Sequence, residues 1–321
     1  MIPRRWSHLQ SRATGAFLGL AVGDALGATV EFMTPNEIRA RYGVHREMTG
    51  GGWLHLAPGR VTDDTTMSLA LGQAILCERR IDPLVIGRAF DDWMRSKPVD
   101  IGNTVRRGIL HFRRTGTPVA PPDEQDAGNG SCMRVLPVIL ACHGGHEADL
   151  ERAVLHQGRV THHNPLAEAG SLCMARLVRM ALDGIEIPAM LAGPVADLIA
   201  DHPIFRFRAR KEITHPSGFI AETLRAVFQG FFDSDSFEDC LIRVVNLGGD
   251  ADTTGAIAGM LAGAYHGVEA IPSRWLNALY PPIAEACVQQ ALGLVAAGPF
   301  PVSTTELPRT TPRSPGALPL P

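Results

Sequence analysis

Glycine recurs at every fourth position in two distant segments of the chain. The first segment has glycine at positions 15, 19, 23 and 27, and the second has it at positions 255, 259, 263 and 267. Glycine destabilises a helix by about 1 kcal/mol per residue relative to alanine, so these stripes need a compensating interaction. We expect two central helices that pack closely through their glycine faces. The alternative is a helix that lies flat against a ligand, and either arrangement places the helix ends deep in the protein.

The rest of the chain also has a helical pattern. Apolar residues recur mostly at helical spacing, and alternating strand patterns are nearly absent. Three sites carry signals typical of a helix N-terminus: Thr34-Pro35-Asn36-Glu37, Asp82-Pro83, and Ser236 with Asp239. The pattern predicts an all-α protein, with helices after Thr34 and over 5–28, 64–79, 83–96, 104–114, 130–142, 148–159, 166–182, 187–201, 217–232, 237–246, 254–266 and 281–297.

Domain organisation and location follow from composition. We expect one domain over residues 1–298, followed by a disordered tail over 299–321 that is rich in Pro, Ser and Thr.

The formal net charge of −3 excludes the broad basic face by which many proteins bind nucleic acid. An apolar run over 16–22 is interrupted by Gly19 and followed at once by Asp24. We therefore expect no signal peptide and no membrane insertion, but a cytoplasmic protein whose six scattered cysteines are free.

Two acidic segments each precede an apolar helical stretch. They are Thr62-Asp63-Asp64-Thr65 and the segment 248–254, which contains Asp250, Asp252 and Thr253. Each could simply be a helix N-cap, but a cap needs one such side chain only. Carboxylates crowded in a helical core repel one another unless a cation neutralises them. Metal binding is therefore the better interpretation of both segments.

The donor types indicate which metal. Oxygen donors from Asp and Thr, without cysteine or a histidine pair nearby, favour Mg²⁺ or Mn²⁺. The Asp250-x-Asp252 spacing lets one carboxylate face each of two ions, with Asp63 and Asp64 closing the other side. Glu31 lies in an apolar setting, where its pKa would rise and it could serve as an acid or base. Asp24 is better explained as a buried hydrogen-bonding group at a helix end.

Four segments follow one another along the chain: Gly15–Glu31, Thr62–Thr65, Asp126–Arg134 and Gly248–Gly263. Together they resemble the motifs of the ADP-ribosylglycohydrolase family. The similarity covers about residues 13–298, and three further segments resemble the branch of the family that acts on dinitrogenase reductase: 48–53, 98–104 and 245–254. The resemblance implies a single-domain orthogonal helical bundle around a binuclear Mg²⁺ or Mn²⁺ centre.

The resemblance also assigns roles to individual residues. Asp100 matches a carboxylate needed for attack at the ribose, and Glu31 lies beside the metals as a second catalytic candidate. The implied metal ligands are Thr62, Asp63, Asp64, Asp250, Asp252 and Thr253. The implied substrate-binding residues are Asn103, Gly128, Asn129, Gly130, Ser131, Met133 and His162, of which those over 128–131 would receive a diphosphate on backbone N–H groups.

The function implied is hydrolysis of the bond between ADP-ribose and an arginine side chain. The expected target is ADP-ribosylated dinitrogenase reductase, and a PII signalling protein is a possible partner by resemblance alone. One alternative is a hydrolase of the same fold that acts on ADP-ribosylated serine, nucleic acid or a small molecule. Another is a relative that binds ADP-ribose without turnover, which the full set of expected metal ligands argues against.

Overall fold

The computed structural model describes residues 6–208 and 213–305 of the chain. Within these ranges the protein is helical, and strand-like pairing is limited to isolated bridges that join 51 with 56, 81 with 302 and 128 with 219. The expected all-α architecture is confirmed. The helices are α1 (His8–Gly27), α2 (Pro35–Tyr42), α3 (Asp63–Glu78), α4 (Pro83–Arg95), α5 (Asn103–Thr115), α6 (Gly130–Met133), α7 (Leu136–Ala141), α8 (Glu147–Arg159), α9 (Pro165–Leu182), α10 (Ile187–Met190), η1 (Leu191–Val195), α11 (Ala196–Asp201), η2 (Pro203–Phe205), α12 (Ile220–Phe232), α13 (Phe237–Val245), α14 (Ala251–His266), η3 (Val268–Ala270), α15 (Ser273–Ala278) and α16 (Pro281–Ala297).

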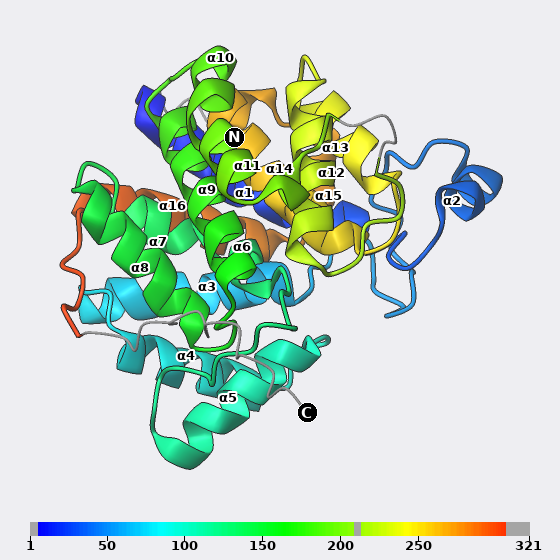
Figure 1. Cartoon of the computed structure of the whole chain (residues 1–321). Helices are drawn as coiled ribbons and strands as arrows, with labels where there is room; N and C mark the ends of the chain where they lie inside the picture. Colours follow the sequence, from blue (N-terminus) through cyan, green and yellow to red (C-terminus); the bar gives the residue numbers. More distant parts are fainter. Residues whose placement is uncertain (1–5, 209–212, 306–321) are drawn as a thin grey trace, which may run out of the picture.

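The two glycine stripes form the contact between α1 and α14, which cross the centre of the molecule in antiparallel orientation (Figure 1). A Cβ atom at Gly19 would lie 2.2 Å from the carbonyl oxygen of Gly259, so only glycine permits this approach. At the other end of the contact, a Cβ atom at Gly27 would lie 2.1 Å from the carbonyl oxygen of Ala251. The pairing therefore brings the C-terminus of α1 beside the N-terminus of α14.

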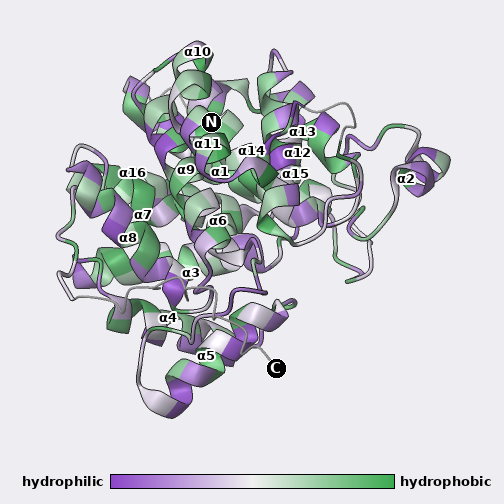
Figure 2. Ribbon diagram, viewed as in Figure 1, coloured by the Kyte–Doolittle hydropathy of each residue, from purple (hydrophilic) through white to green (hydrophobic). Residues whose placement is uncertain are grey.

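Further helices enclose this central pair. α16 packs against α1, α13 and α12 pack against α14, and α3, α4 and α5 follow one another outward (Figure 1). Figure 2 shows that α7, in the interior, is almost uniformly hydrophobic, whereas α5 alternates between hydrophilic and hydrophobic residues. All six residues of α7 are buried, and α5 buries one side only. α5 therefore forms part of the outer wall next to α4.

The three N-terminal signals seen in the sequence are confirmed as helix caps. The side chain of Thr34 accepts a hydrogen bond from the backbone N–H of Glu37 at the start of α2. Asp82 caps α4 in the same way, and the Ser236 side chain accepts from the backbone N–H of Asp239 in α13. Each cap satisfies N–H groups that the first helical turn leaves without a partner.

Several expected helix boundaries are wrong. The helix expected over 130–142 is divided into α6 and α7, because Pro137 has no N–H to continue the hydrogen-bond ladder. The helix expected over 187–201 is interrupted by the π-helical turn η1, where Gly193 has non-helical dihedral angles and Pro194 follows. α14 begins at Ala251 rather than at residue 254, so Asp252 and Thr253 belong to its first turn.

The boundary expected at residue 298 is too early. Phe300 is 5% exposed, and its backbone N–H donates to the carbonyl oxygen of Ala141 at 2.9 Å. Ile81 pairs with this segment through hydrogen bonds to Pro301 and Ser303 of 2.9 and 2.8 Å. The apolar side chain of Phe300 lets the segment pack despite its proline-rich composition. Residues 306–321 of the expected tail lie outside the described residues.

The cysteines and the helix lengths bear on the remaining expectations. All six cysteines are free thiols, as expected, and Cys77 is exposed while the other five are buried. Within the described residues, no helix combines the length and the apolar character needed to cross a bilayer.

Candidate metal centre and catalytic cavity

The two acidic segments, 190 positions apart in the chain, meet at one end of the central helix pair. The Thr62 hydroxyl lies 3.1 Å from Oδ2 of Asp64 and 3.3 Å from Oδ2 of Asp252. From the second segment, the Thr253 hydroxyl lies 3.3 Å from Oδ2 of Asp64. All four side chains are buried. The antiparallel pairing of α1 and α14 therefore also decides where the acidic residues gather.

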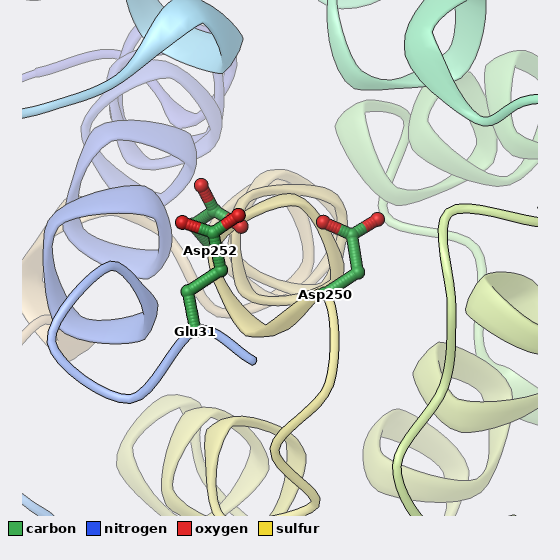
Figure 3. Close-up of side chains that lie close together, drawn as sticks. All are labelled: Glu31, Asp250 and Asp252. Carbon is green, nitrogen blue, oxygen red and sulfur yellow. The ribbon is translucent and has the colours of Figure 1, made fainter. Parts of the chain in front are cut away.

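Glu31 joins the cluster from the segment that follows α1. One carboxylate oxygen of Glu31 and one each of Asp250 and Asp252 lie within 4.8 Å of one another. Figure 3 shows the three side chains at the N-terminal end of α14, where Glu31 and Asp252 overlap in the view and Asp250 lies to one side of them. The indole N–H of Trp53 donates to Oε2 of Glu31 and fixes the orientation of this carboxylate.

Asp24 has a different role in the same region. Its carboxylate accepts hydrogen bonds from the backbone N–H groups and the hydroxyls of both Thr62 and Thr65. Burial raises the pKa of Asp24 to about 6, and these hydrogen bonds limit the rise. Asp24, in α1, thus caps the N-terminus of α3 and holds Asp63 and Asp64 in place. The geometry agrees with its interpretation as a hydrogen-bonding group.

The electrostatics of the cluster favour a bound cation. Burial, together with neighbouring carboxylates, raises the pKa of Asp63 to about 7 and that of Glu31 to about 8. The same causes raise the pKa of Asp64 and of Asp252 far above the ordinary value. Oδ1 of Asp64 is buried and has no hydrogen-bond partner among the described residues. A cluster of oxygen donors with an unpaired buried carboxylate oxygen fits a hard divalent cation.

The cluster opens into a cavity of about 630 Å³. Asp100 lies on its wall in the loop before α5, and Asn103 begins that helix. Thr62 and Asp64 lie behind the lining, and the Ser131 hydroxyl lies 3.1 Å from that of Ser171, away from the cavity. The expected site residues that line the cavity are Glu31, Asp63, Asp100, Asn103, Gly128, Asn129, Gly130, Met133, His162, Asp250, Asp252 and Thr253.

The glycine-containing loop over 128–130 forms the side of the cavity next to His162. A Cβ atom at Gly130 would lie 2.7 Å from Cε1 of His162, so glycine is needed for the histidine ring to pack there. Burial lowers the pKa of His162 well below its ordinary value and keeps the ring neutral. The Asn129 amide donates to Asp250 at 2.6 Å and connects this loop to the acidic cluster. α6, which begins at Gly130, has only four residues.

Two residues of this region were missed in the sequence. Arg134 is completely buried. It donates hydrogen bonds to the carbonyl oxygen of Gly130 and to the Thr161 hydroxyl. It therefore supports both the loop over 128–130, which we call the glycine loop, and the segment that carries His162. An arginine inside the otherwise apolar stretch over 131–142 was the available signal. Trp53 ends the 48–53 motif, but nothing local to that motif indicates that it reaches Glu31.

Comparison with known proteins identifies the family. Residues 5–299 match the family model described as ADP-ribosylglycohydrolase. The chain belongs to the ADP-ribosylglycohydrolase family. The chain is 52% identical over 271 residues to the ADP-ribosyl-[dinitrogen reductase] glycohydrolase of Rhodospirillum rubrum, with 84% of this chain and 91% of that protein covered.

Two further relatives support the assignment. The chain is 34% identical over 279 residues to the ADP-ribosylarginine hydrolase Tri1 of Pseudomonas putida, covering 83% of this chain and 73% of that protein. A solved structure titled ADP-ribosylglycohydrolase-related protein complex superimposes with a TM-score of 0.80 at 39% identity, over 90% of this chain and 99% of the other. The expected ADP-ribosylglycohydrolase fold is therefore confirmed.

Proposed function

We propose that this protein removes ADP-ribose from an arginine side chain, and that its target is dinitrogenase reductase. The observation that carries the proposal is the buried acidic cluster at the base of the 630 Å³ cavity, with Asp100 on the wall of the same cavity. Support comes from the similarity to one glycohydrolase named for dinitrogen reductase and one hydrolase named for ADP-ribosylarginine. A cavity of this volume is large enough for a ligand of ADP-ribose size.

Two divalent cations, Mn²⁺ or Mg²⁺, fit this site. Glu31 lies beside the proposed ligands. When bound, the ions would neutralise the buried carboxylates and hold the ribose hydroxyls. The residues proposed to hold them are Thr62, Asp63, Asp64, Asp250, Asp252 and Thr253.

The chain supplies the remaining chemistry through carboxylates and the glycine loop. Cleavage of the glycosidic bond develops positive charge at the ribose carbon, which an ionised carboxylate stabilises. Asp100, on the cavity wall, would serve this task and would remove a proton from the attacking water. Backbone N–H groups at Gly128 and Gly130 would receive the diphosphate, next to the neutral ring of His162. The N–H of Asn129 donates to the carbonyl oxygen of Gly218 at 2.9 Å, so Asn129 would contribute through its side chain. The proton on the departing guanidine nitrogen comes from solvent or from Glu31.

The deciding experiment measures ADP-ribose release from two arginine-linked substrates. The purified protein is incubated with Mn²⁺ and either ADP-ribosylarginine or arginine-modified dinitrogenase reductase, and free ADP-ribose is quantified by chromatography. We expect release from both, loss of release when EDTA removes the metal, and little release from a serine-linked peptide. Preference for the serine-linked peptide would identify a different hydrolase, and binding of ADP-ribose without any release would identify a non-catalytic relative.

A further inference from the structure

Two exposed aromatic side chains border the catalytic cavity on the side of Glu31. Phe32 is 60% exposed and Trp53 is 48% exposed, and both line the cavity. Their ring centroids are 5.4 Å apart, and the ring planes are inclined by 51°. The two rings therefore form an open corner, which we call the aromatic corner. Neither side chain is needed to fill the hydrophobic core.

The backbone holds Phe32 in an unusual conformation. Its φ angle is 63°, a left-handed value that is unfavourable for a residue other than glycine. Hydrogen bonds to Gly249 maintain it: the N–H of Phe32 donates to Gly249 O at 2.7 Å, and the N–H of Gly249 donates to Met33 O at 3.0 Å. Strain of this kind concentrates at functional sites, where the surrounding structure enforces it. The result is an aromatic ring held outside the core, next to the acidic cluster.

A tight turn positions Trp53. Gly50, Gly51 and Gly52 all have positive φ, and Gly51 pairs with Leu56 through hydrogen bonds of 2.7 and 3.0 Å. A Cβ atom at Gly52 would lie 2.2 Å from the carbonyl oxygen of Ala28, so this glycine lets the turn approach the end of α1. The three glycines of the 48–53 motif thus form the turn that places the indole of Trp53 at the cavity.

The exposed ring faces of the aromatic corner favour a planar organic cation. The indole N–H of Trp53 is used by Glu31, which leaves the ring face available. Glu31, Asp250 and Asp252 lie close together next to it, so the aromatic corner borders the proposed metal site, where the bond to the arginine would be cleaved. A planar, weakly hydrated guanidinium group stacks well on aromatic faces, and its alkyl stem can cover the remaining apolar surface. A serine-linked substrate has a neutral oxygen at this position, so it gains no comparable binding energy from the aromatic faces.

We propose that the aromatic corner of Phe32 and Trp53 is the subsite for the guanidinium group and alkyl stem of the modified arginine, and that it selects arginine over neutral linkages. This inference rests on the proposed function of the same site. ADP-ribose itself has no guanidinium group, so the aromatic corner contributes to binding of the arginine-linked substrate and not to binding of free ADP-ribose. That difference makes the subsite measurable apart from the rest of the cavity.

The first test replaces Phe32, which does not contact Glu31 through a hydrogen bond. Phe32→Leu keeps an unbranched Cβ at the left-handed position and removes the ring. We expect KM for ADP-ribosylarginine to rise about 3- to 10-fold with kcat nearly unchanged, because binding common to ground and transition states is lost. Affinity for free ADP-ribose in the presence of Mn²⁺, measured by calorimetry, should stay at the wild-type value. Tyr280→Leu is the matched control, because Tyr280 is an exposed aromatic residue outside this cavity.

The second test separates the two contributions of Trp53. Trp53→Phe retains an aromatic face but removes the N–H that holds Glu31, so kcat should fall while KM changes little. Trp53→Leu removes both, so KM should rise as well. This division between KM and kcat would not result from a general loss of structure, and retained ADP-ribose binding confirms that each variant is folded.

The outcomes distinguish the subsite from the function. Wild-type KM in both Phe32→Leu and Trp53→Leu would overturn the arginine subsite while leaving arginine-linked hydrolysis intact. Failure of the wild-type protein to cleave ADP-ribosylarginine would overturn the proposed function instead. If a variant does not fold, tryptophan emission of the wild-type protein is recorded while agmatine is added in the presence of ADP-ribose. Unchanged emission would count against the subsite, and a change that Trp53→Phe abolishes would support it.

Discussion

Asp24 and Asp64 are both fully buried carboxylates, but they differ in their hydrogen-bond partners. Asp24 is surrounded by the N–H and hydroxyl donors of Thr62 and Thr65, so the chain itself satisfies its charge. Within the part of the chain that the structure describes, Asp64 keeps one carboxylate oxygen without a hydrogen-bond partner. A buried carboxylate with an unused oxygen is costly unless a cation or a proton completes it. The difference separates a structural carboxylate from one suited to bind metal.

The role of Asp100 gives a prediction at the scale of one residue. Asp100→Asn preserves size and removes the negative charge and the basic oxygen. Because the proposed metal ligands are other residues, we expect Mn²⁺ affinity to change by only a few-fold, while kcat for ADP-ribosylarginine falls by about 10²- to 10⁴-fold. Metal binding is followed by calorimetry and turnover by ADP-ribose release.

The matched control for this variant is Asp92→Asn. Asp92 is an exposed aspartate on α4 that does not line the cavity, and its replacement should leave both properties unchanged. If Asp100→Asn retained full turnover, another group would have to act as the base. If the variant lost its metal as well, Asp100 would belong to the metal site.

At the scale of elements, the sequence predicts a helix cap when the capping residue directly precedes the helix, but not when it lies far away in the chain. The caps of α2, α4 and α13 come from the residue directly before each helix, so the sequence shows them. α3 has no side-chain cap from its own Thr62 and depends on Asp24, 38 positions earlier. Nothing in the local sequence indicates that contact, since it exists only when α1 and α3 pack together.

The contact between α1 and α14 gives a prediction for helix packing. In Gly19→Ala, the added methyl group would clash with the backbone of Gly259, which cannot move aside as a side chain can. We expect a loss of about 1–3 kcal/mol in the free energy of unfolding, despite the better helix propensity of alanine. Mn²⁺ binding should weaken too, because the spacing of the two helices sets the spacing of the acidic residues.

Gly158→Ala in α8 is the control for that substitution. A Cβ atom at Gly158 would meet no atom closer than 3.5 Å, so alanine fits. The free energy of unfolding, measured by urea denaturation, should be unchanged or higher by up to about 1 kcal/mol. If Gly19→Ala and the wild type had the same free energy of unfolding, α1 and α14 could move apart to admit the methyl group without loss of stability.

At the scale of the whole molecule, the acidic cluster makes stability depend on pH. In the metal-free protein the pKa values of Asp63 and Glu31 are raised to about 7 and about 8, above those of the unfolded chain. The folded state therefore binds more protons than the unfolded state between about pH 4 and 8, and stability falls as pH rises through that window. The expected loss is on the order of a few kcal/mol.

Bound Mn²⁺ should reverse this trend, because it competes with protons for the same carboxylates and binds more tightly as pH rises. We therefore expect the difference in melting temperature between Mn²⁺-loaded and EDTA-treated protein to grow from pH 5 to pH 8. Differential scanning fluorimetry across this range is sufficient. A difference independent of pH would show that the cluster does not hold the metal.

Sequence was enough to predict the helical class, the local caps, the close packing of the glycine stripes and the residue types of the acidic segments, because these depend on spacing and on neighbours along the chain. Its errors also have local causes, such as Phe300, whose apolar side chain packs within a proline-rich segment. The expected packing of the two glycine stripes against each other is confirmed. The packed structure was needed to show that Asp24 caps α3 and that Trp53 reaches Glu31. These contacts join residues far apart in the chain, and their geometry exists only once the helices have packed.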